Sequence, residues 1–270
     1  MARRPPLALL LPAGIFFAAF FLLPMGRLFL IGGSGSSGWG AYAAILGDAG
    51  QLRALGATLG VAAATTVATL IIGAVAGVFL QRHRFPGRDA LVAMLTLPLA
   101  FPGVVVGFMV IMLAGRQGLI GRLTEALGGD RLVFAYSLFG LFLGYVYFSV
   151  PRAILTIMAA ADKLDPRLEE AARSLGAHRW QLVRDVILPG LKPALISAGA
   201  ICFATAMGAF GTAFTLATRI NVLPMAIYTE FTLAANIAMA AAMSFILGAV
   251  TWAILALARS AAGASVAAAG

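Results

Sequence analysis

Two adjacent carboxylates, Glu169 and Glu170, stand out in a polar segment, 161–193, that interrupts an otherwise apolar chain. A carboxylate pair can act as general acid and general base when its surroundings separate the two pKa values. The preceding residues indicate another use. Asp165 is a good helix N-cap and Pro166 fits the first helical position, so both glutamates fall in early turns, where the helix dipole favours negative charge. We therefore expect a solvated helix start and no catalytic residue at this position.

The rest of the chain offers no better candidate for catalysis or metal binding. His83 and His178 lie far apart without a nearby second ligand, and the single cysteine, Cys202, lies in an apolar run. The sequence contains no G-x-x-x-x-G-K-[ST] stretch, the loop whose backbone N–H groups hold nucleotide phosphates. We predict that this chain is not an enzyme and binds no metal ion or cofactor of its own.

The polar segment carries a spaced pattern. Glu170-Ala171-Ala172 is followed after three residues by Gly176, and nine residues later by Val186-Ile187-Leu188-Pro189. This pattern resembles the EAA loop of the permease subunits of binding-protein-dependent ABC importers, which reads EAA, three residues, Gly, nine residues, Ile-x-Leu-Pro. The one departure is Val186 in place of Ile, a residue of similar shape. The resemblance covers roughly the C-terminal two thirds of the chain, from the loop near Arg82.

The resemblance implies a docking role for this segment. In these permeases the element is a coupling helix that docks into a cleft of a cytoplasmic ATPase. The positions that match the motif or flank it are Glu170, Ala171, Ala172, Arg173, Gly176, Leu188 and Pro189. The implied partners are two ATPase subunits that carry the ATP and Mg, a second permease subunit (a heterodimer is favoured over a homodimer) and an external substrate-binding protein.

The composition is that of a membrane protein. The chain is 61% hydrophobic and 11% charged, whereas soluble domains carry about 25% charged residues. The +9 net charge does not indicate nucleic-acid binding, because the basic residues are scattered between apolar runs. A helix needs about 20 apolar residues to cross a bilayer. Six stretches qualify, and they predict an all-α membrane protein in a single domain spanning 1–270: roughly 7–31, 54–80, 90–114, 135–160, 194–217 and 237–258.

Basic residues set the expected orientation. With the N-terminus inside, the cytoplasmic segments hold thirteen of the 19 Lys and Arg residues, with Arg152 counted among them, and the opposite side holds six. This asymmetry predicts an N-in, C-in protein of the bacterial cytoplasmic (inner) membrane, with 161–193 in the cytoplasm. We read 7–31 as an uncleaved first span, because it is longer than a signal h-region and no A-x-A site follows.

Two segments within the spans are candidates to line a pathway. Leu97–Gly103 holds two prolines in the third span, and Thr205–Thr215 alternates glycine, aromatic and hydroxyl residues in the fifth. Irregular backbone at membrane depth is tolerated where it is buried or lines a cavity. Both segments look like stretches in permeases of the polyamine, iron, thiamine, sulfate and molybdate importers. The pathway candidates, together with an acidic residue between spans five and six, are Pro98, Pro102, Thr205, Gly208, Phe210, Gly211, Thr212 and Glu230; helix packing, and for Glu230 a solvated loop, are the alternatives.

No charged residue is expected at the centre of any span, so selectivity should not depend on a buried charge. The favoured function is therefore the permease subunit of an ATP-driven ABC importer for a small solute, with a polyamine-like solute preferred. The alternatives are a stand-alone secondary transporter or channel, which would usually show intramembrane charges or inverted repeats, and a membrane scaffold, which would not explain the polar segment.

Overall fold

The structure is a computed structural model that describes residues 10–216 and 220–262. Within these ranges every regular element is a helix. Several long helices contain π or 3-10 turns, which are labelled η. The elements are α1 (Leu11–Phe17), η2 (Ala18–Leu22), α2 (Leu23–Gly32), α3 (Gly40–Gly47), α4 (Ala49–Arg82), α5 (Arg88–Thr96), η3 (Leu97–Ala100), α6 (Gly103–Ala114), α7 (Leu119–Ala126), α8 (Leu138–Ala161), α9 (Pro166–Ser174), α10 (Arg179–Leu182), η4 (Val183–Ile187), α11 (Leu188–Gly208), α12 (Gly211–Leu216), α13 (Leu223–Tyr228), η5 (Thr229–Leu233) and α14 (Ile237–Ala262).

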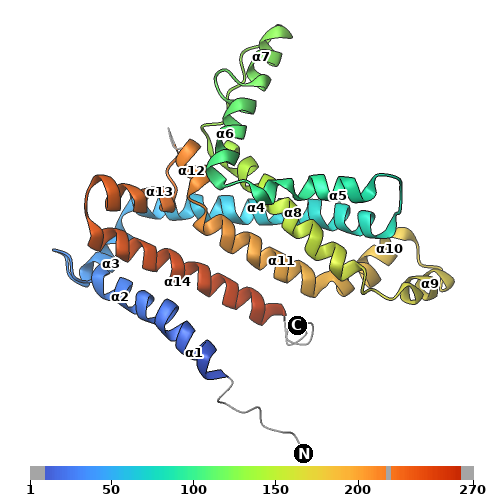
Figure 1. The fold of residues 1–270 in the computed structure, drawn as a ribbon, viewed down its shortest axis with the longest axis horizontal. Coiled ribbons are helices and arrows are strands. Elements are labelled where there is room, and N and C mark those ends of the chain that lie inside the picture. Colours follow the sequence, from blue (N-terminus) through green and yellow to red (C-terminus); the bar gives the residue numbers. More distant parts are fainter. Residues whose placement is uncertain (1–9, 217–219, 263–270) are drawn as a thin grey trace, which may run out of the picture.

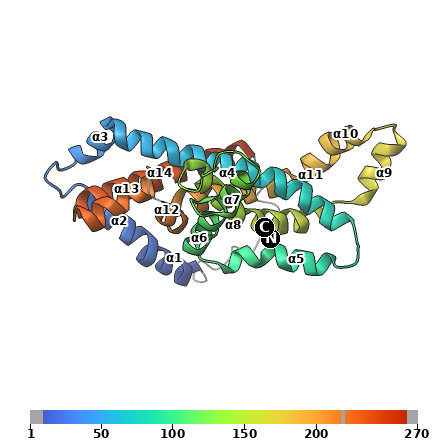
Figure 2. The same ribbon diagram turned by 90° about the horizontal axis from the view of Figure 1, so that it is seen from above.

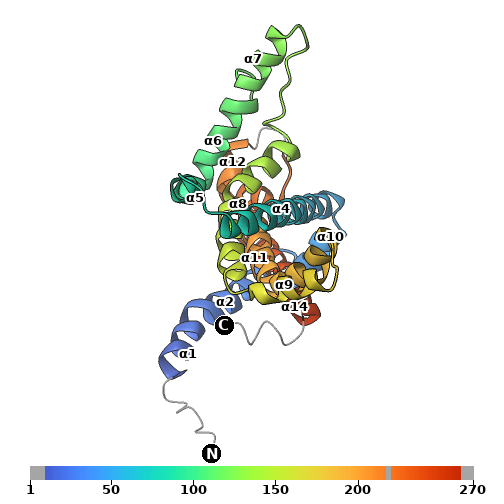
Figure 3. The same cartoon turned by 90° about the vertical axis from the view of Figure 1, so that its right-hand side faces the viewer.

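The helices α4, α8 and α11 form the centre of the molecule. Helix α8 packs along α4, and α11 packs against both. Helix α14 lies beside α11 and carries α2 on its outer side, so the first span is peripheral (Figures 1 and 2). Helix α6 packs against α8 and α12, and α7, which follows it, projects away from the bundle (Figures 1 and 3). The largest buried apolar cluster joins α4, α8, α11 and α12, where residues such as Leu141, Met207 and Leu216 are fully enclosed.

Small residues allow α4 and α8 to approach closely. A Cβ atom added at Gly73 would lie 2.7 Å from the Cβ of Ala153, and one at Gly77 would lie 3.1 Å from the Cβ of Ile157. At Gly56 and Gly60, earlier in α4, an added Cβ would meet no atom within 4 Å. Close backbone approach in lipid requires such small residues, so Gly73 and Gly77 serve packing within this chain.

The six predicted spans are confirmed, with shifted boundaries. The long apolar helical stretches are Leu11–Gly32, Ala49–Arg82, Gly103–Ala126, Leu138–Ala161, Arg179–Gly208 and Ile237–Ser260. In the expected third span, 90–114, the helix is broken where the two prolines lead us to expect it, by the 3-10 turn η3 and by extended backbone at Phe101 and Pro102. Pro98 and Pro102 supply no N–H donor to a helix. The long apolar stretch therefore starts at Gly103 and runs on to Ala126.

The helix of the fifth span begins and ends earlier than the expected 194–217. It starts at Arg179 and continues past both prolines. Pro189 follows a π turn at the first positions of α11, and Pro193 is accommodated inside the helix. It ends at Gly208, where Ala209 adopts an extended conformation. Residue 217 lies outside the described ranges.

The arrangement of the loops agrees with the predicted topology. Arg82, at the end of α4, forms an ion pair with Glu169 of α9, so the second–third and fourth–fifth loops share one side of the bundle. In Figure 1, α3 and α13 mark one end of the long axis and α9 and α10 the other. Helices α2 and α14 both reach the α3 end, so the described chain begins and ends away from that end.

Candidate functional site

The short helix α9 has the local geometry that the sequence predicts. The Asp165 carboxylate caps the helix by accepting a hydrogen bond from the Arg167 backbone N–H (3.0 Å), and Pro166 is the first helical residue. Beyond the helix end, Gly176 has a φ of +84°, which is the left-handed region. An added Cβ at Gly176 would meet no atom within 4 Å. Glycine is therefore required at this turn by the backbone conformation and not by crowding.

Glu169 fixes α9 to the rest of the bundle. It pairs with Arg82 of α4 and, one turn along its own helix, with Arg173, whose Nη2 lies 3.5 Å from the Glu169 carboxylate. Nearby, Gln81 at the end of α4 donates a hydrogen bond to Asp162 at the end of α8. The sequence predicts Glu169 only as a helix-start residue, since no local pattern identifies a partner 87 residues away.

The outer surface of α9 is uncovered. Glu170, Ala171 and Arg173 are exposed, and Glu170 forms no ion pair among the described residues. Leu175, just past the helix, is 89% exposed. Ala172 instead contacts a buried cluster that includes Leu182 and Ile187, so α9 has an inner and an outer face. Leu188 and Pro189 are exposed at the first turn of α11, outside the outer face of α9.

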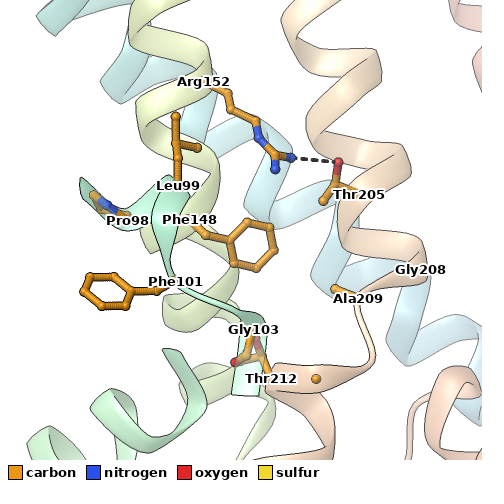
Figure 4. Close-up of a pocket in the computed structure, with 11 residues that line it drawn as sticks. Pro98, Leu99, Phe101, Gly103, Phe148, Arg152, Thr205, Gly208, Ala209 and Thr212 are labelled. Carbon is orange, nitrogen blue, oxygen red and sulfur yellow. Dashed lines mark hydrogen bonds between the residues drawn. The ribbon is translucent and has the colours of Figure 1, made fainter. Parts of the chain in front are cut away.

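A cavity of about 290 Å³ lies between α8, α11 and the break in the third span. Five of the pathway candidates are gathered around it (Figure 4). They are Pro98, Thr205, Gly208, Gly211 and Thr212, and the remaining lining residues are Leu99, Phe101, Gly103, Phe148, Arg152 and Ala209. The cavity thus brings together segments that are more than a hundred residues apart.

Side-chain hydroxyls satisfy the backbone where the helices are broken. Tyr145 donates a hydrogen bond to the carbonyl of Ala209 (2.6 Å), and Thr212 donates one to the carbonyl of Gly103 (2.9 Å). Unsatisfied backbone groups are costly in a membrane. These two bonds allow the chain to leave helical geometry next to the cavity.

Arg152 corrects the expectation that the spans carry no central charge. It lies inside α8, nine residues before the helix ends at Ala161, and its side chain lines the cavity. A charged residue at the centre of a membrane helix costs about 2.5–3.5 kcal/mol in insertion. The count of basic residues places Arg152 with the cytoplasmic ones because it stands near the end of a long apolar run. The apolar run alone does not show that the Arg152 side chain faces the other helices and the cavity between them.

Three pathway candidates lie elsewhere. Pro102 caps the start of α6 but does not line the cavity. Phe210 packs against Phe214 and Tyr228 in tilted ring pairs, with centroids 5.2 and 5.3 Å apart. Glu230 belongs to the π turn η5, near α14. None of these three residues lines the cavity, although Pro102 and Phe210 adjoin residues that do.

In the part of the chain that the structure describes, no group of three or more His, Cys, Asp or Glu residues could hold a metal ion.

Comparison with known proteins gives consistent matches. The family described as "Binding-protein-dependent transport system inner membrane component" matches residues 69–266. A "Probable molybdenum ABC transporter permease protein" of Haloferax volcanii is 33% identical over 82% of this chain and 78% of its own length. The sulfate transport system permease protein CysT of Escherichia coli is 31% identical over 76% of this chain and 73% of its own length. The molybdenum transport system permease protein ModB of E. coli is 37% identical over 56% of this chain and 66% of its own length.

Solved structures share the fold. A bacterial alginate ABC transporter, crystallised with a periplasmic protein that holds an alginate pentasaccharide, matches with a TM-score of 0.79 at 20% identity, covering 96% of this chain and 94% of that one. The methionine transporter MetNI matches with a TM-score of 0.59 at 20% identity, covering 79% of this chain and 94% of that one.

The relatives do not support the preference for a polyamine-like solute, because their names refer to sulfate and molybdenum. The family match also excludes a stand-alone transporter or channel. The protein is a non-enzymatic, multi-pass subunit of the inner membrane that works with an ATPase and a binding protein. The chain belongs to the family of inner-membrane components of binding-protein-dependent transport systems, the permease subunits of ABC importers.

Proposed function

We propose that this chain forms part of the pathway for a small tetrahedral oxyanion of the sulfate and molybdate class. The support for this solute class is the similarity of the chain to a sulfate permease and to molybdenum permeases at 31–37% identity. An external binding protein captures the oxyanion and delivers it to the permease. ATP hydrolysis then drives it across the membrane.

Coupling to ATP hydrolysis takes place through α9 in this proposal. The observation that carries it is the uncovered outer face of α9 on a helix that is fixed to α4 by Glu169 and Arg82. A rigidly attached helix can pass a displacement of its docking partner to α4 and α8. An exposed side chain such as Leu175 is suited to a partner's apolar cleft.

The complete transporter has two permease chains and two ATPase subunits in this proposal. One chain carries one α9, and a pair of ATPases requires two docking helices. A homologous second permease is favoured over a second copy of this chain. ATP and Mg bind to the ATPase subunits, since this sequence contains no phosphate-binding loop.

Uptake by the purified complex in proteoliposomes tests the solute class. The permease, its ATPase and its binding protein are reconstituted, and entry of radiolabelled sulfate, molybdate and spermidine is followed with and without ATP. We expect ATP-dependent accumulation of one of the oxyanions only when the binding protein is present. Accumulation of spermidine without either oxyanion would contradict the proposed solute.

A further inference from the structure

One charged side chain, Arg152, reaches into the cavity between α8 and α11. Its guanidinium points across the cavity toward Thr205 (Figure 4). Arg152 Nη1 donates a hydrogen bond to Thr205 Oγ1 (3.2 Å), and the Thr205 hydroxyl donates to the carbonyl of Ile201 (2.7 Å). Thr205 is therefore oriented by its own helix and can accept from the guanidinium. This contact directs Arg152 across the cavity instead of along α8.

Among the described residues, most of the hydrogen-bonding capacity of Arg152 is not used. A guanidinium has five N–H donors, and the bond to Thr205 uses one of them. All ten acidic residues of the chain lie in the described ranges, and none of them forms an ion pair with Arg152. The cavity therefore carries a positive charge that no carboxylate of this chain neutralises.

The other walls suit a small ion. Gly208 and Gly211 present backbone without side chains, and the adjacent Pro98, Leu99 and Phe148 offer no charge. The volume of about 290 Å³ is near the lower end of small-molecule sites, which begin at about 300 Å³. A small inorganic ion fits this space better than an extended organic cation, which Arg152 would repel.

We propose that Arg152 and Thr205 form an anion-binding station within the membrane pathway, at which a tetrahedral oxyanion pauses during import. This inference rests on the proposed function, because it supplies the contacts for the solute class proposed there. The planar guanidinium can donate two parallel hydrogen bonds to two oxygens of such an anion. A single arginine leaves the binding weak enough for release, as conduction requires.

Four variants and one control test the station in the reconstituted complex. Arg152→Gln removes the charge, Arg152→Lys keeps the charge without the planar fork, and Thr205→Val removes the hydroxyl that orients the guanidinium. A double variant, Arg152→Thr with Thr205→Arg, moves the charge to the opposite wall of the same cavity. Lys192→Gln is the control, because it removes an exposed charge from α11 outside the cavity. Oxyanion uptake, basal ATPase rate and assembly are measured for each.

We expect Arg152→Gln to lower kcat/KM for oxyanion uptake at least about tenfold while basal ATPase activity remains, since the charged contact with the oxyanion is lost. Arg152→Lys should retain part of the activity, and Thr205→Val should lose about threefold because only the orientation of the charge changes. The double variant should recover uptake relative to Arg152→Gln, and Lys192→Gln should match the wild type.

Wild-type uptake in Arg152→Gln and Arg152→Lys would overturn the station while leaving the oxyanion function intact. If Arg152→Gln fails to assemble, the well-assembled Arg152→Lys and Thr205→Val complexes decide the matter, and normal kcat/KM in both overturns the proposal. Failure of the wild-type complex to import either sulfate or molybdate is a different result, because it contradicts the solute class itself.

Discussion

Helix α9, the proposed coupling helix, is formed by one continuous segment, whereas the cavity is formed by segments that are far apart in the sequence. Helix α9 and its turn are one continuous segment, 165–176, whose capping residue, proline and glycine act on their immediate neighbours. The cavity joins η3, α8, α11 and α12, and its one charge depends on a contact between residues 152 and 205. In the proposed function the first region is a surface for the ATPase, and the second is a partly open cavity that takes the solute. Changes in α9 should therefore separate ATP hydrolysis from transport, whereas changes in the cavity should impair transport with the ATPase still bound.

Leu175→Asp should have the largest effect among changes in the coupling region. Leu175 is almost fully exposed in the free chain, so the substitution should not alter folding. In a docked complex it would bury a charge in an apolar cleft, and we expect binding of the ATPase to weaken by about 2–3 kcal/mol or more. Co-purification of the ATPase measures this. Leu127→Asp, at a similarly exposed leucine just past α7, is the matched control, and equal loss in both variants would remove α9 from the interface.

Gly176→Val should impair coupling through backbone strain. A left-handed conformation costs a β-branched residue at least about 1–2 kcal/mol, which corresponds to roughly a 5–30-fold loss of the correct turn. We expect transport driven by ATP hydrolysis to fall by a similar factor. Gly176→Asn is the matched control, since asparagine tolerates this region and the space around the site is open. Coupled transport at the wild-type rate in the valine variant would argue against a role for this turn.

Two glycines that line the cavity differ in the space around them: Gly211 is packed against α6, whereas Gly208 faces open space. An added Cβ at Gly211 would lie 3.0 Å from the Val104 backbone N, whereas at Gly208 it would meet nothing within 4 Å. We expect Gly211→Ala to lower the stability of the purified protein by about 1–3 kcal/mol, because α6 and α12 must move apart. Gly208→Ala should change stability by less than about 0.5 kcal/mol. Thermal unfolding in detergent compares the two, and equal melting temperatures would show that α6 adjusts without cost.

Glu169→Gln should give the smallest effect, since it removes an ion pair that is partly open to solvent. Such pairs contribute about 1 kcal/mol or less, so the ATPase rate stimulated by the loaded binding protein should fall a few-fold. Glu170→Gln changes the neighbouring carboxylate, which has no ionic partner in the described chain. A loss in Glu170→Gln but not in Glu169→Gln would show that the acidic contact belongs to the ATPase and not to α4.

The same contrast explains what the sequence could predict. The capped start of α9, its glycine turn and the six spans follow from local composition and spacing, and the structure confirms them. The prolines also predicted the break in the third span, although not that α7 would project from the bundle beyond α6. The pairing of Glu169 with Arg82 and the placement of Arg152 depend on how α4, α8 and α11 pack. No spacing within one segment records these contacts, so the charge in the cavity could not be predicted from the sequence.

The most direct test of the cavity as a transport pathway is a change in its accessibility during the ATP cycle. Gly208 lines the cavity, is exposed and has room for a side chain. Gly208→Cys is prepared with the buried native thiol removed by Cys202→Ala, and Gly40→Cys on α3, also in open space, is the control. Thr212, which is buried, would be a poorer probe. Reaction with a water-soluble thiol reagent is timed in the resting and ATP-trapped complexes.

We predict that the labelling rate at Gly208→Cys changes by about tenfold or more between the two states, because alternating access turns the cavity from one side of the membrane to the other. The rate at Gly40→Cys should stay constant. Equal rates at Gly208→Cys in both states, in a complex that transports at the wild-type rate, would contradict the account and remove this cavity from the pathway.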